Sequence, residues 1–196
     1  MKLHIGCGTV YLKGYINIDG AEDQVPGECP SELLERNSTT FDQYYKRDFN
    51  VSTDCVEVVA DLKHDLRQPL PFPDGSVEEI VMYQVLEHLP QYNVGRLLDD
   101  INRVLSNGCV FIVSVPDVKG MAKLLVEAQT DEDEDLAIRF IHGTQRNEWS
   151  HHFCGYVPRT LMALLVKHGF GHFEQMPNIN CYPVVHLKAL KEKGNV

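Results

Sequence analysis

The chain has 196 residues, of which 43% are hydrophobic, a length and composition typical of one globular domain with a sizeable core. Its formal net charge of -10 argues against nucleic acid as a partner, because binding to a phosphate backbone depends on clustered lysine and arginine. No apolar run approaches the roughly 20 residues needed to cross a bilayer, so we expect a soluble cytoplasmic protein without a membrane partner.

The first predicted strand, Leu3 to Ile5, runs into the turn Gly6-Cys7-Gly8, and a second predicted strand, Tyr15 to Ile18, ends on Asp19. Two glycines let a backbone approach a ligand where a side chain would collide. A carboxylate at the end of the next strand can accept hydrogen bonds from both hydroxyls of a ribose. The pattern therefore predicts a nucleoside-type cofactor.

A dinucleotide-binding fingerprint would require a third glycine where Tyr11 stands, and its acid would come about 20 residues along, roughly twice as far as Asp19. An NAD-linked enzyme is therefore disfavoured. The motif instead resembles motif I, and the acid that follows it, of the class I S-adenosylmethionine-dependent methyltransferases. The resemblance implies that Gly6, Cys7, Gly8 and Asp19 bind S-adenosylmethionine.

Only six residues separate Gly8 from Tyr15, whereas a parallel crossover usually needs about a dozen or more and contains a helix. We therefore expect the first crossover helix to be shortened or absent, with one wall of the cofactor pocket built differently. The insertion from Ala21 to Asp54, which is polar and contains an aromatic cluster, is a candidate for that wall and for a lid. Plain surface decoration is the alternative.

A third predicted strand, Val56 to Val59, runs out into Asp61 and Leu62. An aspartate at the carboxyl edge of the sheet can accept a hydrogen bond from the exocyclic amino group of adenine, and the Leu62 N–H can donate to a ring nitrogen. The alternative is that Asp61 only caps the following turn. With Asp19 one strand away, we favour the adenine site.

The segment from Pro71 to Leu89 contains a turn at Pro73-Asp74-Gly75 and a predicted strand, Glu79 to Tyr83. Gln84 then emerges at the carboxyl end of that strand, where it can contact the cofactor. Leu86-Glu87-His88 should open the next helix, with His88 as a packed, hydrogen-bonded residue rather than a base. The segment resembles the PFPDxSFDxI and VLEHL stretch of methyltransferase-11-like families.

The rest of the chain continues the alternation of helices and strands that is typical of an α/β fold with a largely parallel sheet. An acidic run from Asp131 to Asp135 is interpreted as the solvated start of a helix. The other predicted elements are a helix at Asn93 to Leu105 ended by Gly108, a strand at Cys109 to Val113, a helix capped by Asp117 and running to about Gln129, a helix from Pro158 to before Gly169, and strands at Phe170 to Gln175 and Val184 to Leu190.

Two later motifs, Phe140 to Gln145 and His152 to Leu161, resemble a subgroup of predicted methyltransferases that carry FGGQ and HxxGF in this order. The resemblance implies a seven-stranded Rossmann-like sheet with a reversed last strand, S-adenosylmethionine as cofactor and S-adenosylhomocysteine as product. His152 fits the histidine of the subgroup and can act as a general base toward a hydroxyl. The alternative is that His152 fixes a loop by hydrogen bonds.

No metal site is expected. The six cysteines are far apart without a CxxC pair, and we interpret them as reduced thiols. Six histidines gather in the last third of the chain, but neighbours such as His151 and His152 point to opposite faces of an extended segment and seldom share an ion.

The sequence therefore predicts a single methyltransferase domain over residues 1–196 that transfers a methyl group to oxygen or nitrogen of a small metabolite or sugar-like acceptor. The alternative is a catalytically inactive protein on the same fold that binds a nucleoside or a protein partner.

Overall fold

The computed structural model describes residues 1–8, 10–20, 60–145, 149–178, 180 and 182–192, and the backbone of residues 25–26, 35–36 and 55–56. The predicted insertion at Ala21 to Asp54 and the predicted strand residues 57–59 lie outside this part of the chain. Within the insertion, the structure describes the backbone of the short strands β4 (Val25–Pro26) and β5 (Glu35–Arg36), and the short strand β6 (Cys55–Val56) follows the insertion.

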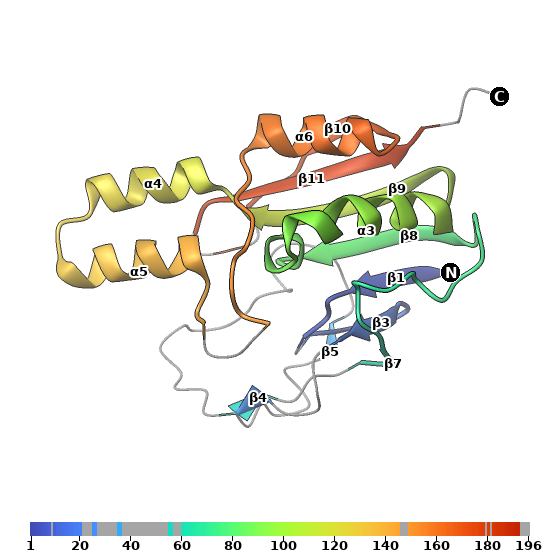
Figure 1. Ribbon diagram of the computed structural model, residues 1–196, viewed down its shortest axis with the longest axis horizontal. Coiled ribbons are helices and arrows are strands. Elements are labelled where there is room, and N and C mark those ends of the chain that lie inside the picture. Colours follow the sequence, from blue (N-terminus) through green and yellow to red (C-terminus); the bar gives the residue numbers. More distant parts are fainter. Residues whose placement is uncertain are drawn as a thin grey trace.

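The core of the fold is a seven-stranded sheet in the order β10-β11-β9-β8-β1-β3-β7 (Figure 1). Strand β11 runs antiparallel to both of its neighbours, and the other pairs are parallel. The predicted Rossmann-like sheet with a reversed last strand is therefore confirmed. The strands are β1 (Lys2–Ile5), β3 (Ile16–Asp19), β7 (Leu62–Lys63), β8 (Val77–Tyr83), β9 (Leu105–Pro116), β10 (Phe170–Gln175) and β11 (Val184–Lys191).

The connection from β1 to β3 contains no helix in residues 6–8 and 10–15, the part of it that the structure describes, so the missing crossover helix is also confirmed. A short strand, β2 (Tyr11–Leu12), occupies part of the connection and pairs with β5. The buried amide of Asn17 holds this connection in place. It accepts from Leu12 N at 2.8 Å and donates to the carbonyls of Leu12 and Tyr15 at 3.2 Å each.

Helices α3 (Gln91–Val104) and α6 (Pro158–Lys167) cover one face of the sheet, whereas α4 (Val118–Glu127) and α5 (Asp131–His142) project as a pair beyond the carboxyl ends of β8 and β9 (Figure 1). The main apolar core lies under α3 and α6, and its fully buried members include Ile5, Ile80, Phe111, Leu98 and Leu165. The other face buries a smaller apolar cluster around Tyr83. No helix in the described part of the chain could span a membrane.

The starts of α4 and α5 follow the sequence predictions closely. Asp117 caps α4 by accepting from Lys119 N at 3.1 Å, and the acidic run begins α5 as expected. Two other predictions, one of a helix end and one of a helix start, were wrong. Helix α3 ends at its C-cap Leu105, because Leu105 pairs with Val77 in the sheet, and Gly108 lies inside β9 with φ +76°. The predicted helix opening at Leu86 is a separate 3₁₀ turn, η1 (Leu86–His88).

Candidate functional site

The carboxyl edge of the sheet brings together the glycine turn and Asp19. Gly6 has φ +68°, and a Cβ at this position would lie 2.1 Å from Cγ2 of Val85, which follows β8. Gly8 has φ +51°, and a Cβ there would meet none of the described residues within 4 Å. Gly6 is therefore required by packing and by backbone conformation, whereas Gly8 combines a conformation that favours glycine with open space beside the backbone.

Asp19 ends β3 directly beside this turn, as its place after the second predicted strand implied. The backbone N–H of Gly8 donates to Oδ2 of Asp19 at 2.7 Å. The turn is tied to the same strand by its other amides, since Gly6 N and Cys7 N donate to the carbonyl of Ile18 at 2.7 and 3.0 Å. A glycine turn and a carboxylate from the neighbouring strand therefore form one unit at the sheet edge.

The side chain of Cys7 is buried between these elements. Burial, with the nearby Asp19 carboxylate, raises the pKa of the Cys7 thiol well above its usual range. A protonated, buried thiol is a weak nucleophile, so Cys7 contributes backbone and packing to the site rather than chemistry.

Asp61 does not occupy the strand end where the sequence placed it. It comes immediately before β7, whose first residue, Leu62, pairs with Ile18 at the start of the β3–β7 ladder. The Asp61 carboxylate accepts from Asn17 N at 2.8 Å, from Asn17 Nδ2 at 3.0 Å and from the Tyr11 hydroxyl at 3.2 Å. Burial alone would raise the pKa of Asp61, but these hydrogen bonds outweigh it and lower the pKa.

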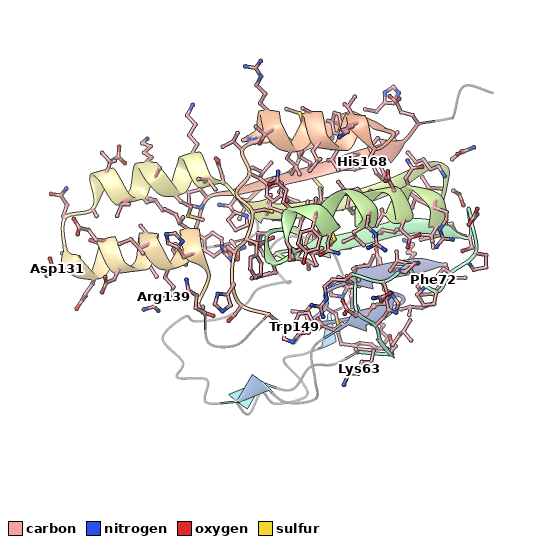
Figure 2. The ribbon with its side chains drawn as sticks, viewed as in Figure 1. Lys63, Phe72, Asp131, Arg139, Trp149 and His168 are labelled. Atoms are coloured by element: carbon pink, nitrogen blue, oxygen red, sulfur yellow. The ribbon has the colours of Figure 1, made fainter. Side chains whose placement is uncertain are left out.

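Asp65, which the sequence interpretation missed, lies beyond the carboxyl end of β7. The β3–β7 pairing continues to His64, whose N–H donates to the carbonyl of Asp19 at 2.9 Å. The Asp65 carboxylate accepts from Arg67 N and Nε at 2.9 Å, and the Arg67 side chain keeps the pKa of Asp65 below its usual value. The guanidinium of Arg67 lies 5.1 Å from the ring centre of Trp149. Figure 2 shows Trp149 reaching toward this end of the sheet.

Gln84 emerges at the end of β8, as predicted, in the left-handed backbone conformation with φ +56°. Ser114 and Tyr182 hold its side chain. Gln84 Nε2 donates to the Ser114 hydroxyl at 3.0 Å, and the Tyr182 hydroxyl donates to Gln84 Oε1 at 3.0 Å. A non-glycine residue in this conformation costs energy, and its fixed amide at a strand end is typical of a functional position.

His152 and His88 meet beside Gln84's strand, with ring centres 4.8 Å apart. Each directs Nδ1 at a backbone carbonyl: His88 at His151 O, 2.9 Å away, and His152 at Ile141 O, 3.2 Å away. His88 is thus a packed, hydrogen-bonded residue, as the sequence indicated. Glu87, to which the sequence analysis gave no role at a site, lies within the same cluster.

Burial sets the charge state of all three side chains. It raises the pKa of Glu87 to about 8 and lowers the pKa of His88 to about 4, with the neighbouring His152 adding to the effect on His88. Burial also lowers the pKa of His152. At neutral pH both imidazoles therefore carry a lone pair on one ring nitrogen.

Comparison with known proteins gives a consistent result. Residues 3–113 match the model of a family described as a methyltransferase domain. A probable S-adenosylmethionine-dependent methyltransferase from Mycolicibacterium smegmatis is 40% identical over 57 residues, which are 29% of this chain and 21% of that protein. The match therefore spans about a fifth of the length of this relative.

Two solved structures resemble the whole chain. An S-adenosylmethionine-dependent methyltransferase from Methanosarcina mazei superposes with a TM-score of 0.55 and 16% identity over 97% of this chain and 92% of the other. One from Mesorhizobium loti superposes with a TM-score of 0.52 and 15% identity over 96% of this chain and 89% of the other. At this identity the likeness concerns the fold.

Proposed function

Because the chain belongs to the methyltransferase domain family, we propose that it transfers a methyl group from S-adenosylmethionine to oxygen or nitrogen of a small metabolite or sugar-like acceptor. The observation that carries this proposal is the contact of Gly8 N with the Asp19 carboxylate, 2.7 Å long, at the carboxyl edge of a mostly parallel sheet. Ligands of such sheets bind at this edge.

The residues at this edge fit the cofactor. Gly8 presents backbone without a side chain to space that is free of the described residues, which suits the methionyl part of the ligand. Asp19 lies next to this turn and supplies a carboxylate for the ribose hydroxyls.

We move the proposed adenine contacts to a second Asp-Leu pair further along the chain. Asp61 precedes β7, whereas Asp65 follows the carboxyl end of β7, so we place Asp65 and Leu66 at the adenine in the roles first given to Asp61 and Leu62. Asp65 follows β7 at the same edge as Asp19 and is one-third exposed. A carboxylate there can accept from the exocyclic amino group, and the Leu66 N–H can donate to a ring nitrogen.

The bound cofactor supplies an already activated methyl group, so the main contribution of this chain is to orient the reactants. Gln84 is the candidate for the reacting end, because Ser114 and Tyr182 fix both ends of its amide group. His152, together with Glu87 and His88, is the candidate for activating the acceptor. A neutral imidazole can take a proton from a hydroxyl as the methyl group is attacked.

The insertion at Ala21 to Asp54 begins two residues after Asp19, the last residue of β3, so its start follows directly on the proposed site. We assign it the role of a lid within a single domain. Long connections at this edge commonly cover ligands.

Calorimetric titration of the full chain with S-adenosylmethionine, S-adenosylhomocysteine and NAD tests the proposal. We expect binding of both sulfur ligands and no binding of NAD. Silence toward S-adenosylmethionine and S-adenosylhomocysteine, or binding of NAD in their place, would overturn it and favour an interaction protein or an oxidoreductase.

A further inference from the structure

Three potential metal ligands meet beside the end of β8 although they come from segments far apart in the chain. Glu87 and His88 lie on η1, and His152 lies in the loop before α6. One ligand atom from each of the three lies within 4.8 Å of the other two. Backbone hydrogen bonds hold the loop on η1, because Phe153 N and Cys154 N both donate to the Glu87 carbonyl, at 2.7 and 3.2 Å.

The carboxylate of Glu87 lacks a partner that would explain its burial. The residue is 1% exposed, and neither of its carboxylate oxygens has a hydrogen-bond partner among the described residues. An unpaired buried carboxyl group is costly, and such groups are usually paired or bound to a metal ion. His88 and His152 each place a potential ligand atom within 4.8 Å of a carboxylate oxygen of Glu87.

Both histidines are oriented as metal-binding histidines commonly are. Each has Nδ1 beside a backbone carbonyl, which fixes the proton on Nδ1 and leaves Nε2 with a lone pair. A backbone carbonyl on the other ring nitrogen is the usual partner of a histidine that coordinates a metal. The His88 carbonyl partner belongs to His151, so the loop that supplies His152 also orients His88.

We propose that Glu87, His88 and His152 bind one divalent transition-metal ion of the Zn²⁺ type. Two imidazoles and one carboxylate are a known ligand set for zinc sites that keep an open coordination position. A tetrahedral ion with bonds of about 2.1 Å holds its ligand atoms about 3.4 Å apart. Ligand atoms that lie within 4.8 Å of one another reach that spacing through side-chain shifts of about 1.4 Å or less at the widest pair.

The open position gives the ion a role at the acceptor end of the site. An ion on Nε2 of His152 occupies the lone pair of the imidazole, so in the metal-bound form the ion takes over the activating role proposed above for His152. An oxygen or nitrogen atom of the acceptor that binds a divalent ion loses its proton more easily. This role rests on the proposed function, whereas ion binding itself does not. The sequence argument against a metal concerned ligands adjacent in the chain, such as His151 and His152. In the structure the His151 ring instead lies near the ring of Phe153.

The test uses the full chain, treated with a chelator, dialysed and then titrated with Co²⁺ as a spectroscopic substitute for Zn²⁺. We expect one equivalent to bind with the visible absorption of nitrogen and oxygen ligands and without a thiolate charge-transfer band. Glu87→Gln and His152→Gln should each weaken this binding more than about a hundredfold, since even loss of a residue that only orients a ligand costs 10- to 100-fold. His151→Gln is the matched control and should bind as the wild type does.

The proposal is overturned if the wild type binds no Co²⁺, if its binding shows thiolate ligands, or if both variants bind as tightly as His151→Gln. Titration of each variant with S-adenosylhomocysteine shows whether the fold persists, and the half-buried His152→Gln variant decides the result if Glu87→Gln fails to fold. A wild type that binds Co²⁺ but no S-adenosylhomocysteine would leave the metal site standing and refute the proposed function.

Discussion

Replacing each glycine of the first turn by alanine should separate packing from ligand binding. In Gly6→Ala the new Cβ would lie 2.1 Å from Cγ2 of Val85, and the backbone would keep φ near +68°. The left-handed conformation costs an alanine about 1–2 kcal/mol. Forcing an extra methyl group into a packed region costs about 1–3 kcal/mol. We therefore expect Gly6→Ala to lose about 2–5 kcal/mol of unfolding free energy.

Gly8→Ala is the matched control, because it introduces the same methyl group at φ +51° where no atom of the described part of the chain lies within 4 Å. Only the conformational cost of about 1–2 kcal/mol applies to it. At about 2–4 °C per kcal/mol for a domain of this size, the melting temperature should fall by roughly 4–20 °C in Gly6→Ala and by roughly 2–8 °C in Gly8→Ala. Affinity for S-adenosylhomocysteine should fall in Gly8→Ala, because its methyl group enters the space proposed for the ligand.

Thermal unfolding followed by circular dichroism, with calorimetric titration of the same samples, measures both effects. A double variant, Gly6→Ala with Val85→Ala, should lose about 1–3 kcal/mol less than the sum of the two single variants, because the clash is relieved. Equal destabilisation by Gly6→Ala and Gly8→Ala, together with strictly additive losses in the double variant, would refute this account of the turn.

Three further predictions concern the aspartates and His4. Asp19→Ala should weaken S-adenosylhomocysteine binding at least about thirtyfold, equivalent to about 2 kcal/mol, whereas His152→Ala should leave this affinity nearly unchanged and slow turnover; the reverse order would contradict the assigned roles. Asp65→Asn should weaken S-adenosylhomocysteine binding about tenfold, whereas Asp61→Asn should mainly lower the melting temperature. Equal affinities of the two variants for S-adenosylhomocysteine would contradict the assignment of Asp65 to the adenine. Burial lowers the pKa of His4 from 6.5 to about 4, so the folded state binds fewer protons than the unfolded state between these values and stability falls as the pH drops through that window. Denaturation at pH 7 and pH 4 should therefore show the wild type losing about 3 kcal/mol more than His4→Gln, and parallel losses would rule out a neutral buried His4.

The features that could be predicted from the sequence are those that depend on residues close together in the chain. The glycine turn and Asp19 belong to two strands joined by six residues between Gly8 and Tyr15, so their proximity follows from a short connection. The N-cap at Asp117 is equally local, because its side chain accepts from an amide two residues away. The reversed last strand came from the family resemblance, and the sheet order confirms it.

The misplacement of Asp61 has a specific physical cause. Asp61-Leu62 and Asp65-Leu66 are two similar dipeptides four residues apart, and either could follow a short strand. The choice depends on where β7 pairs with β3, and that pairing begins opposite Ile18 at Leu62. Asn17, which donates hydrogen bonds to the Asp61 carboxylate, is distant from Asp61 in sequence. No local pattern could therefore indicate that this carboxylate is hydrogen-bonded within the protein.

The cluster of Glu87, His88 and His152 depends on contacts between segments that are far apart in the chain. The same holds for the hydrogen bonds to the side chain of Gln84. His152 reaches His88 only because the loop before α6 bonds to the carbonyl of Glu87. Ser114 lies at the end of β9 beside Gln84 because β9 continues to Pro116 in its pairing with β11. Hydrophobic pattern predicted that β9 exists, but its length is set by both neighbouring strands.

A crystal structure of the full chain with S-adenosylhomocysteine tests the central claim most directly. The account predicts the ribose hydroxyls within hydrogen-bond distance of the Asp19 carboxylate, the methionyl part against Gly6 and Gly8, and the adenine beside Asp65. Density for the ligand elsewhere on the molecule, or a ribose without contact to Asp19, would contradict it.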